Sequence, residues 1–185
     1  MNAHYGICLS DSTHNTFTNN TANSNNRYGI YLYNADNNNI TCNWVAHNDQ
    51  RGFYLYSGST GNNISYNNIM SNGELQLDGS YHWNFYNKQS DAVVAEHNYW
   101  GTTSSAVIVA GIKEDTGSVD YEPFLTAPAP CAPGPEPAPE PLNITSFAPS
   151  SPVNDTVCTW RTFNVTVNQT VNVSWYLNNS LLHTN

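Results

Sequence analysis

The chain has 185 residues, with 14 Asp and Glu against five Lys and Arg, and its formal net charge is −9. This acidic balance argues against nucleic acid or an anionic membrane surface as a partner. Only 10% of the residues are charged, well below the ~25% of an ordinary soluble domain. No apolar run approaches the ~18 residues of a membrane span, so we expect no such span in this chain.

A short phrase recurs at a fixed interval from the start of the chain. Residues 5–9 (YGICL), 28–32 (YGIYL) and 51–55 (RGFYL) are its copies, and their glycines are spaced 23 residues apart. A weaker fourth copy is expected at residues 74–78 (ELQLD). Self-similarity at 20–50 residues is typical of a solenoid, in which each repeat buries its apolar side chains against the next.

Each repeat carries three apolar positions, which predict three short strands. The first position is the alternating pair of Ile30 and Leu32 and its equivalents. The second column is Phe17, Ile40, Ile64 and Phe85, and the third is Ala22, Val45 and Ile69. Turn-forming Asn, Ser, Thr and Gly separate them, so we predict an all-β, triangular parallel coil. A leucine-rich repeat is disfavoured because the return segments lack a helical period.

Asparagines also recur in register, as at Asn20, Asn43 and Asn67. Asn carries both a donor and an acceptor, and stacked strands lie ~4.8 Å apart. One side chain can therefore donate to its equivalent in the next coil. The alternative is that these asparagines are only solvated turn residues.

Residues 28–32 followed by 37–41 (NNNIT) resemble the right-handed parallel β-helix repeats of the carbohydrate-binding and sugar-hydrolase group, including the NosD-like proteins. Residues 97–103 (HNYWGTT) and 117–125 (GSVDYEPFL) look like the closing segment of surface-protein members of that group. The resemblance implies a right-handed parallel β-helix domain over residues 1–126, related to S-layer and adhesin-like proteins. It implies little about function, because this fold hosts lyases, epimerases, adhesins and passive wall proteins.

Residues 127–141 form a Pro-rich linker, a composition that favours an extended spacer. Beyond it, residues 143–147, 162–167 and 172–177 are predicted strands, and the Trp-Tyr-Leu-Asn string at 175–178 resembles a strand of Ig-like or PKD-like modules. Such a sandwich needs about seven strands. We therefore expect residues 142–185 to be a partial Ig/PKD-like module, less ordered than the coils.

The compartment is expected to be extracellular or cell-surface. Residues 1–10 lack a signal-peptide pattern and already lie inside a repeat, so the chain resembles a fragment whose signal peptide is not included. Dense Asn-x-Ser/Thr sequons from Asn154 onward suggest a glycoprotein. The cysteine spacing predicts no zinc site, redox pair or disulfide framework, with a Cys131–Cys158 bridge as the alternative.

The candidate binding site is a block of four tyrosines. Because Ile30 and Leu32 point inward, strand alternation places the neighbouring tyrosines outward, and the members of the block are Tyr31, Tyr33, Tyr54 and Tyr56. We expect Arg51, Gln76 and Asp78 to flank them. Aromatic rings with hydroxyl edges suit sugars, which predicts a polysaccharide or cell-wall glycan as partner. The structural alternative is an aromatic ladder that only stabilises the sheet.

Catalysis is not expected. A uronate lyase or epimerase needs clustered basic residues and a base, often with calcium, and the coil region has only Arg27, Arg51 and Lys88. A glycosidase needs two facing carboxylates, and the aspartates of the coils fall in different columns. The histidines share no column either, so we expect neither copper nor another cofactor. The sequence therefore predicts a non-catalytic surface β-helix with a structural or glycan-binding role. The alternative is a polysaccharide-active enzyme of the lyase or epimerase type.

Overall fold

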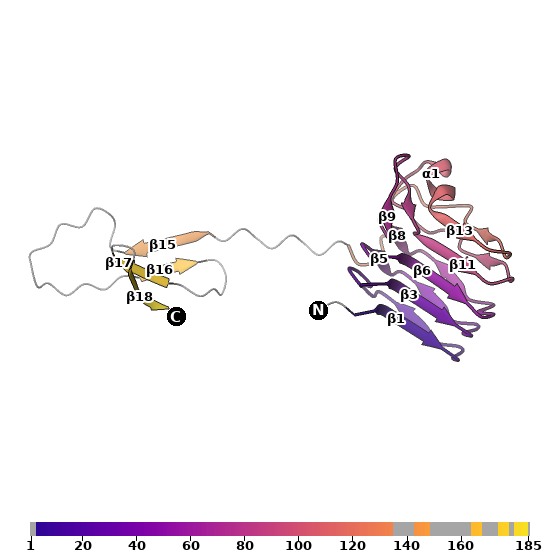
Figure 1. Ribbon diagram of the computed structural model, residues 1–185, viewed down its shortest axis with the longest axis horizontal. Helices are drawn as coiled ribbons and strands as arrows, with labels where there is room; N and C mark the ends of the chain where they lie inside the picture. The colour runs from indigo at the N-terminus through magenta and orange to yellow at the C-terminus, as the bar shows by residue number, and fades with distance from the viewer. Residues whose placement is uncertain (1–2, 135–142, 149–163, 168–173, 178–179, 185) are drawn as a thin grey trace, which may run out of the picture. The chain divides into compact units, whose positions relative to one another are not determined.

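The computed structural model describes residues 3–134, 143–148, 164–167, 174–177 and 180–184. The chain divides into two compact units, Met1–Glu136 and Pro137–Asn185. The first unit is a β-solenoid of about five turns, stacked from β1 at one end to β13 and α1 at the other (Figure 1). The parallel β-helix prediction is confirmed.

The largest sheet of the β-helix contains one strand from each coil. In spatial order its strands are β1 (Tyr5–Ser10), β3 (Tyr28–Tyr33), β6 (Arg51–Tyr56), β11 (Phe85–Lys88) and β13 (Ile112–Glu114). All four pairings are parallel. The strands are in register, so that Ile30 pairs with Phe53, and Phe53 with Phe85.

Two further sides complete each coil, as the three apolar columns predict. The second side consists of β2 (Thr16–Thr18), β4 (Asn39–Thr41) and β7 (Asn63–Ser65). The third pairs β5 (Trp44–Ala46) with β8 (Asn68–Met70). Near the end of the stack, β12 (Val93–Val94) pairs with β14 (Val119–Asp120). The fully buried residues include Ile30, Leu32, Ile40, Val45, Phe53, Leu55, Ile64, Ile69 and Phe85. The interior is therefore a single apolar core.

Glycine in the recurring phrase is required by close packing. A Cβ on Gly29 would lie 2.4 Å from Val45 Cγ1 and 2.6 Å from Asn48 Nδ2, so this position faces inward. Ile30 beside it is also fully buried. Two consecutive inward positions interrupt the strand alternation, and Tyr28 consequently lies on the same side of the sheet as Tyr31, with ring centroids 5.7 Å apart.

Asparagine side chains form three ladders along the stack. In each, Nδ2 of one residue donates to Oδ1 of the next, at 2.8–3.2 Å. The ladders are Asn15–Asn38–Asn62, Asn20–Asn43–Asn67–Asn98 and Asn25–Asn48–Asn72–Asn84. Asn43, Asn67 and Asn98 are fully buried. The predicted ladder is confirmed, and in its buried part the solvated-turn alternative is wrong.

The predicted fourth copy at residues 74–78 is wrong. These residues lie in an antiparallel hairpin of β9 (Glu74–Leu75) and β10 (Tyr81–His82), and Leu77 is fully exposed. A turn at Asp78 and Gly79 ends the run, because Asp78 Oδ1 accepts a hydrogen bond from the Ser80 amide and Gly79 has a φ of +85°. The fourth strand of the large sheet is β11, so Phe85 belongs to the first apolar column and not to the second.

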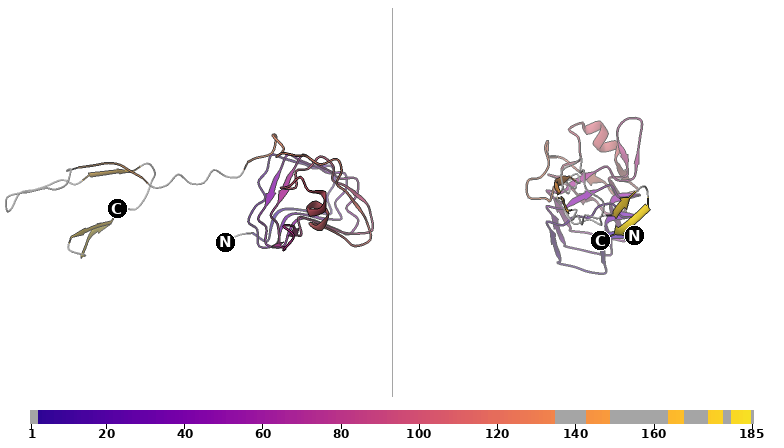
Figure 2. Two further views of the ribbon diagram at one scale, coloured as in Figure 1. Left: turned by 90° about the horizontal axis from the view of Figure 1, so that it is seen from above. Right: turned by 90° about the vertical axis from the view of Figure 1, so that its left-hand side faces the viewer.

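The far end of the stack is covered by α1 (Ser105–Ala110). Ile108 of α1 is buried and belongs to the apolar core, and Trp100 lies in the same cluster. Seen from above in Figure 2, α1 lies within the outline of the coils. The helix therefore closes the core at this end.

The start of the Pro-rich segment packs on the β-helix. Cys131 forms a disulfide with Cys42, which lies 89 residues earlier in the turn after β4. The Ala129 amide donates to Asn68 Oδ1 at 2.8 Å, and Ala129 is buried. The expectation of no disulfide framework and its Cys131–Cys158 alternative are both wrong, because the partner of Cys131 is in the second coil. Cys8 is a free thiol, and Cys158 lies outside the described residues.

The described residues of the second unit form two antiparallel strand pairs. One consists of β15 (Ile144–Ala148) and β16 (Asn164–Val167), and the other of β17 (Ser174–Leu177) and β18 (Ser180–Thr184). Each of the three predicted strands is present, and β18 was not expected. The assignment to an Ig-like or PKD-like module and the linker bounds 127–141 stay predictions.

Candidate functional site

The outward side of the five-stranded sheet carries seven tyrosines, and we call it the tyrosine face. Its tyrosines are Tyr5, Tyr28, Tyr31, Tyr33, Tyr54, Tyr56 and Tyr86. The strand pairing aligns Tyr31 with Tyr54, and Tyr54 with Tyr86, in one column. Tyr33 pairs with Tyr56 in the next column. The predicted four-tyrosine block is thus brought together within a larger set.

The tyrosine rings stack on one another along the β-helix. Tyr31 and Tyr54 have ring centroids 5.4 Å apart and planes 15° apart. Tyr54 and Tyr86 follow at 5.3 Å, and Tyr33 and Tyr56 at 5.7 Å. Contacts of this kind stabilise neighbouring strands, as the ladder alternative requires. Because the faces of stacked rings cover each other, the phenolic edges and hydroxyl groups are the parts available to a ligand.

Three cationic side chains lie over these rings. The Arg51 guanidinium carbon is 4.5 Å from the centroid of the Tyr54 ring, 4.9 Å from that of Tyr28 and 5.0 Å from that of Tyr86. Lys113 Nζ is 4.8 Å from the Tyr86 centroid. These are cation–π distances, at which the ring quadrupole attracts the charge.

Two further cation–π contacts involve the column of Tyr33 and Tyr56 and the indole of Trp83. Lys88 Nζ lies 5.7 Å from the Tyr56 centroid, and Lys113 Nζ lies 5.4 Å from the Trp83 ring. Within the described residues, the single ion pair is His97 with Glu96. The cations of the tyrosine face are therefore held by neutral rings and not by carboxylates.

Two phenols of the central column resist ionisation. Burial raises the pKa of Tyr31 to about 12, and the neighbouring Tyr54 adds to the effect. Burial also raises the pKa of Tyr86 to about 12, and so does its hydrogen bond to Asp115, whose Oδ1 accepts from the Tyr86 hydroxyl at 2.8 Å. Both hydroxyl groups are consequently neutral hydrogen-bond donors and acceptors around neutral pH.

Gln76 and Asp78 do not lie on the tyrosine face. The hairpin in which both lie is outside the five-stranded sheet. Gln76 Nε2 donates to the Glu74 carbonyl, and Asp78 Oδ1 accepts from Ser80. Both side chains are thus engaged in local turn contacts. Arg51, in contrast, lies where it was expected, beside the tyrosines.

Sequence reasoning missed several members of the face. Strict strand alternation predicts that Tyr28 points inward. It lies on the outward side because Gly29 and Ile30 both face inward. Tyr86 was missed because Phe85 was assigned to the wrong column, although the Phe-Tyr pair at 85–86 repeats the pair at 53–54. The position of Lys113 on the face could not be predicted, because β13 carries no copy of the recurring phrase.

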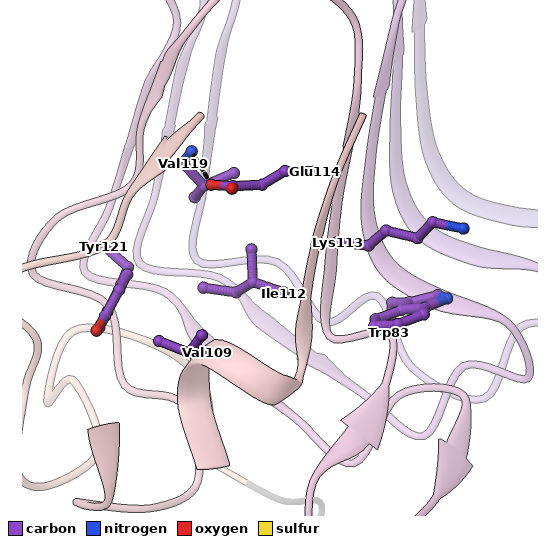
Figure 3. A pocket seen from close by; sticks show the side chains of 7 residues that line it. All are labelled: Trp83, Val109, Ile112, Lys113, Glu114, Val119 and Tyr121. Carbon is purple, nitrogen blue, oxygen red and sulfur yellow. Dashed lines mark hydrogen bonds between the residues drawn. The ribbon is translucent and has the colours of Figure 1, made fainter. Parts of the chain in front are cut away.

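A pocket of about 300 Å³ adjoins the last strand of the sheet. Figure 3 shows Val109, Ile112 and Tyr121 on one side of β13, and Trp83 with Lys113 on the other. Lys113 is shared with the tyrosine face, whereas Ile112 and Tyr121 pack against the apolar core. The one carboxylate that lines the pocket, Glu114, accepts a hydrogen bond from the Val119 amide.

The carboxylates near the face are each hydrogen-bonded to another group of the protein. Asp115 is bonded to Tyr86, and Glu114 to Val119. At the opposite end, Asp11 accepts from Asn34 Nδ2. Each acid is bound to a different element, whereas a glycosidase requires two carboxyl groups on either side of one bond.

Metal ligands are dispersed as well. Across the described ranges, no three His, Cys, Asp or Glu side chains cluster in a way that could hold a metal ion. Copper sites combine several His, Cys or Met ligands. The described residues contain no such group of three His or Cys side chains.

A model of one protein family, described as the periplasmic copper-binding protein NosD, matches residues 1–105, which is more than half of the chain. The chain belongs to the NosD family. The matched residues include the first three coils and most of the fourth, and hence nearly all of the tyrosine face. No curated protein and no solved structure matches the chain significantly. The described part of this NosD-family chain contains no helix long and apolar enough to cross a membrane.

Proposed function

We propose that this NosD-family chain is a non-catalytic β-helix module of an extracellular or cell-envelope protein, and that its tyrosine face binds a polysaccharide. The observation that carries the proposal is the tyrosine face itself. It presents aligned phenol groups from four successive strands, β1, β3, β6 and β11, with three cations among them. The periplasmic description of the family supports an envelope location.

The geometry favours a ligand that is itself a chain of repeating units. Equivalent hydroxyl groups recur at the ~4.8 Å spacing of neighbouring strands, on a sheet whose interior is fully packed. The rings cover one another in part, and Tyr86 is buried with its hydroxyl bonded to Asp115. Sugar hydroxyls would therefore be bound mainly by hydrogen bonds to the partly exposed tyrosines of β3 and β6. Flat stacking of a sugar on a ring face is confined to the margin of the block, where Tyr56 is 40% exposed.

The enzymatic alternative, a uronate lyase or epimerase, has less support. A general base works best with a pKa near the operating pH, and the pKa of Tyr86 is raised to about 12. Asp115, the nearest carboxylate, accepts the hydrogen bond of that same tyrosine. The face thus offers binding groups without a free base.

Glycan retention by a folded double variant tests the proposal. Tyr33→Ala/Tyr56→Ala should abolish retention of the parent's glycan on an array of envelope polysaccharides. The fold should persist, because these rings lie outside the core and their loss costs ~1–2 kcal/mol. The matched control is Tyr66→Ala, which removes a tyrosine that is 45% exposed outside the tyrosine face and contacts His97.

Two outcomes would contradict the proposal. If the parent retains no glycan, or if the control loses retention as fully as the double variant does, the tyrosines are a structural ladder only. A parallel lyase assay on uronate polymers addresses the enzyme alternative, because formation of unsaturated product by the parent and not by Tyr86→Phe would establish catalysis.

A further inference from the structure

The cationic residues of the chain are concentrated on one face. The chain has five Lys and Arg residues and a net charge of −9, and Arg51, Lys88 and Lys113 all lie on the tyrosine face. Of the other two, Arg27 precedes Tyr28 and is exposed, and Arg161 lies outside the described residues. An acidic protein with its basic groups gathered on one surface has a local positive potential there.

Within the described residues, no ion pair joins any of these three cations to a carboxylate. The rings beneath them are neutral, and the single ion pair within the described residues is elsewhere, at His97. Arg51 Nε is buried without a hydrogen-bond partner, so its terminal nitrogens are the groups able to reach a ligand. The acids that border the face are Asp115, bonded to the Tyr86 hydroxyl, Glu114, bonded to the Val119 amide, and Asp11, bonded to Asn34 at the far end.

We infer that the ligand of the tyrosine face is an acidic polysaccharide whose sugars carry carboxylates, that is, a uronate polymer. This inference rests on the proposed glycan binding. The charges lie on β6, β11 and β13, whereas the same columns of β1 carry the uncharged Tyr5, Cys8 and Ser10. The carboxylates should therefore bind over the α1 half of the face, where guanidinium and ammonium groups offer charge-assisted hydrogen bonds.

The test compares two polymers with the same sugar backbone, of which one carries free carboxylates and the other neutral methyl esters. The full chain is titrated with polygalacturonate and with its fully methyl-esterified form. We expect binding to polygalacturonate, weakened by added salt, and at least tenfold weaker binding to the ester. Equal affinity for the two forms would overturn the inference and leave glycan binding intact. Failure to bind either these or any other glycan would refute the proposed function itself.

Variants that remove positive charges locate the contact. An exposed ion pair contributes about 1.5- to 5-fold in affinity, so Lys88→Gln/Lys113→Gln should weaken polygalacturonate binding roughly tenfold. Arg27→Gln removes a charge that contacts no ring, and it should change affinity less than 1.5-fold. An equal loss in the control would overturn the assignment to this face. Binding of dextran sulfate as tightly as polygalacturonate, with no binding of dextran, would show general attraction of anions and overturn the assignment to carboxylates.

Discussion

The third and fourth coils of the β-helix occupy adjacent places in one stack, but they are built differently. The third coil repeats the second at the paired core positions, where Phe53 lies beside Ile30 and Leu55 beside Leu32. The fourth places Phe85 in the column of Phe53, but Asn87 in the column of Leu55. It also begins with a hairpin that has no counterpart in the earlier coils. The stack therefore accepts a coil of different length and composition without losing its register.

The asparagine ladders explain this tolerance. Asn43 and Asn67 are 24 residues apart, and Asn67 and Asn98 are 31 residues apart, yet both pairs make the same Nδ2–Oδ1 hydrogen bond. In the fourth coil, Asn84 extends another ladder from Asn72 across only 12 residues. Register is thus maintained by buried hydrogen bonds at the corners, while the segments between the corners vary in length.

The largest expected effect comes from a charge in the core of the regular coils. Leu55 is fully buried, so Leu55→Asp places a carboxylate between two coils without a partner. We expect a loss of about 4 kcal/mol or more in the free energy of unfolding, measured by urea denaturation. The control is Leu77→Asp in the fully exposed hairpin position of the fourth coil, for which a change below ~0.5 kcal/mol is expected. An unchanged midpoint for Leu55→Asp would show that the register is misassigned.

A smaller loss of unfolding free energy should follow when the asparagine ladder between the third and fourth coils is interrupted at Asn67. Asn67 Nδ2 donates to the Ile40 carbonyl and to Asn98 Oδ1, and its own Oδ1 accepts from Asn43. Asn67→Ala leaves these buried groups unpaired, at a cost of about 2–3 kcal/mol. Asn63→Ala removes an exposed Asn–Asn bond of the same kind and should cost less than ~0.5 kcal/mol. Similar losses in both variants would mean that burial of the ladder is unimportant.

The smallest expected effect is on the pKa values of Tyr31 and Tyr86, which share one column in the second and fourth coils. Asp115→Asn should lower the pKa of Tyr86 in the fourth coil, though burial keeps it above its ordinary value, and should leave Tyr31 near about 12. Because the pKa of Tyr31 is higher in the folded than in the unfolded protein, the stabilisation linked to its protonated form is complete below a pH of about 10. It is lost as the pH rises through about 12. NMR titration of the two rings measures this. Equal shifts of Tyr31 and Tyr86 would contradict the local role of Asp115.

The regular coils could be predicted from the sequence because their residue types recur at constant spacing. That spacing gave Tyr31, Tyr33, Tyr54 and Tyr56 their common face, and Arg51 its place beside them. It also gave the buried columns. In these coils, the turn-forming residues and the apolar periodicity predict the same strand positions.

The fourth coil could not be predicted in the same way, because its hairpin imitates the repeat. Leu75 and Leu77 have the right alternation, and the turn chemistry of Asp78 and Gly79 was the contrary signal. Because residues 74–78 occupy the place of the fourth strand in the sequence pattern, Phe85 was assigned to the second apolar column. Tyr86 was therefore not assigned to the tyrosine face. The pairing of Cys42 with Cys131 could not be predicted for another reason: it depends on where the chain returns after the last coil.

The disulfide between Cys42 and Cys131 determines how the β-helix responds to mechanical force. It closes the third coil, the fourth coil and α1 into one covalent ring. Tension applied to the chain beyond residue 131 enters the β-helix through the turn after β4, and bypasses every residue between 42 and 131. The irregular coils at the α1 end therefore carry none of this load and cannot be unwound one at a time from that side. A pull from the Pro-rich segment must instead act on the second coil, where the stack is most regular.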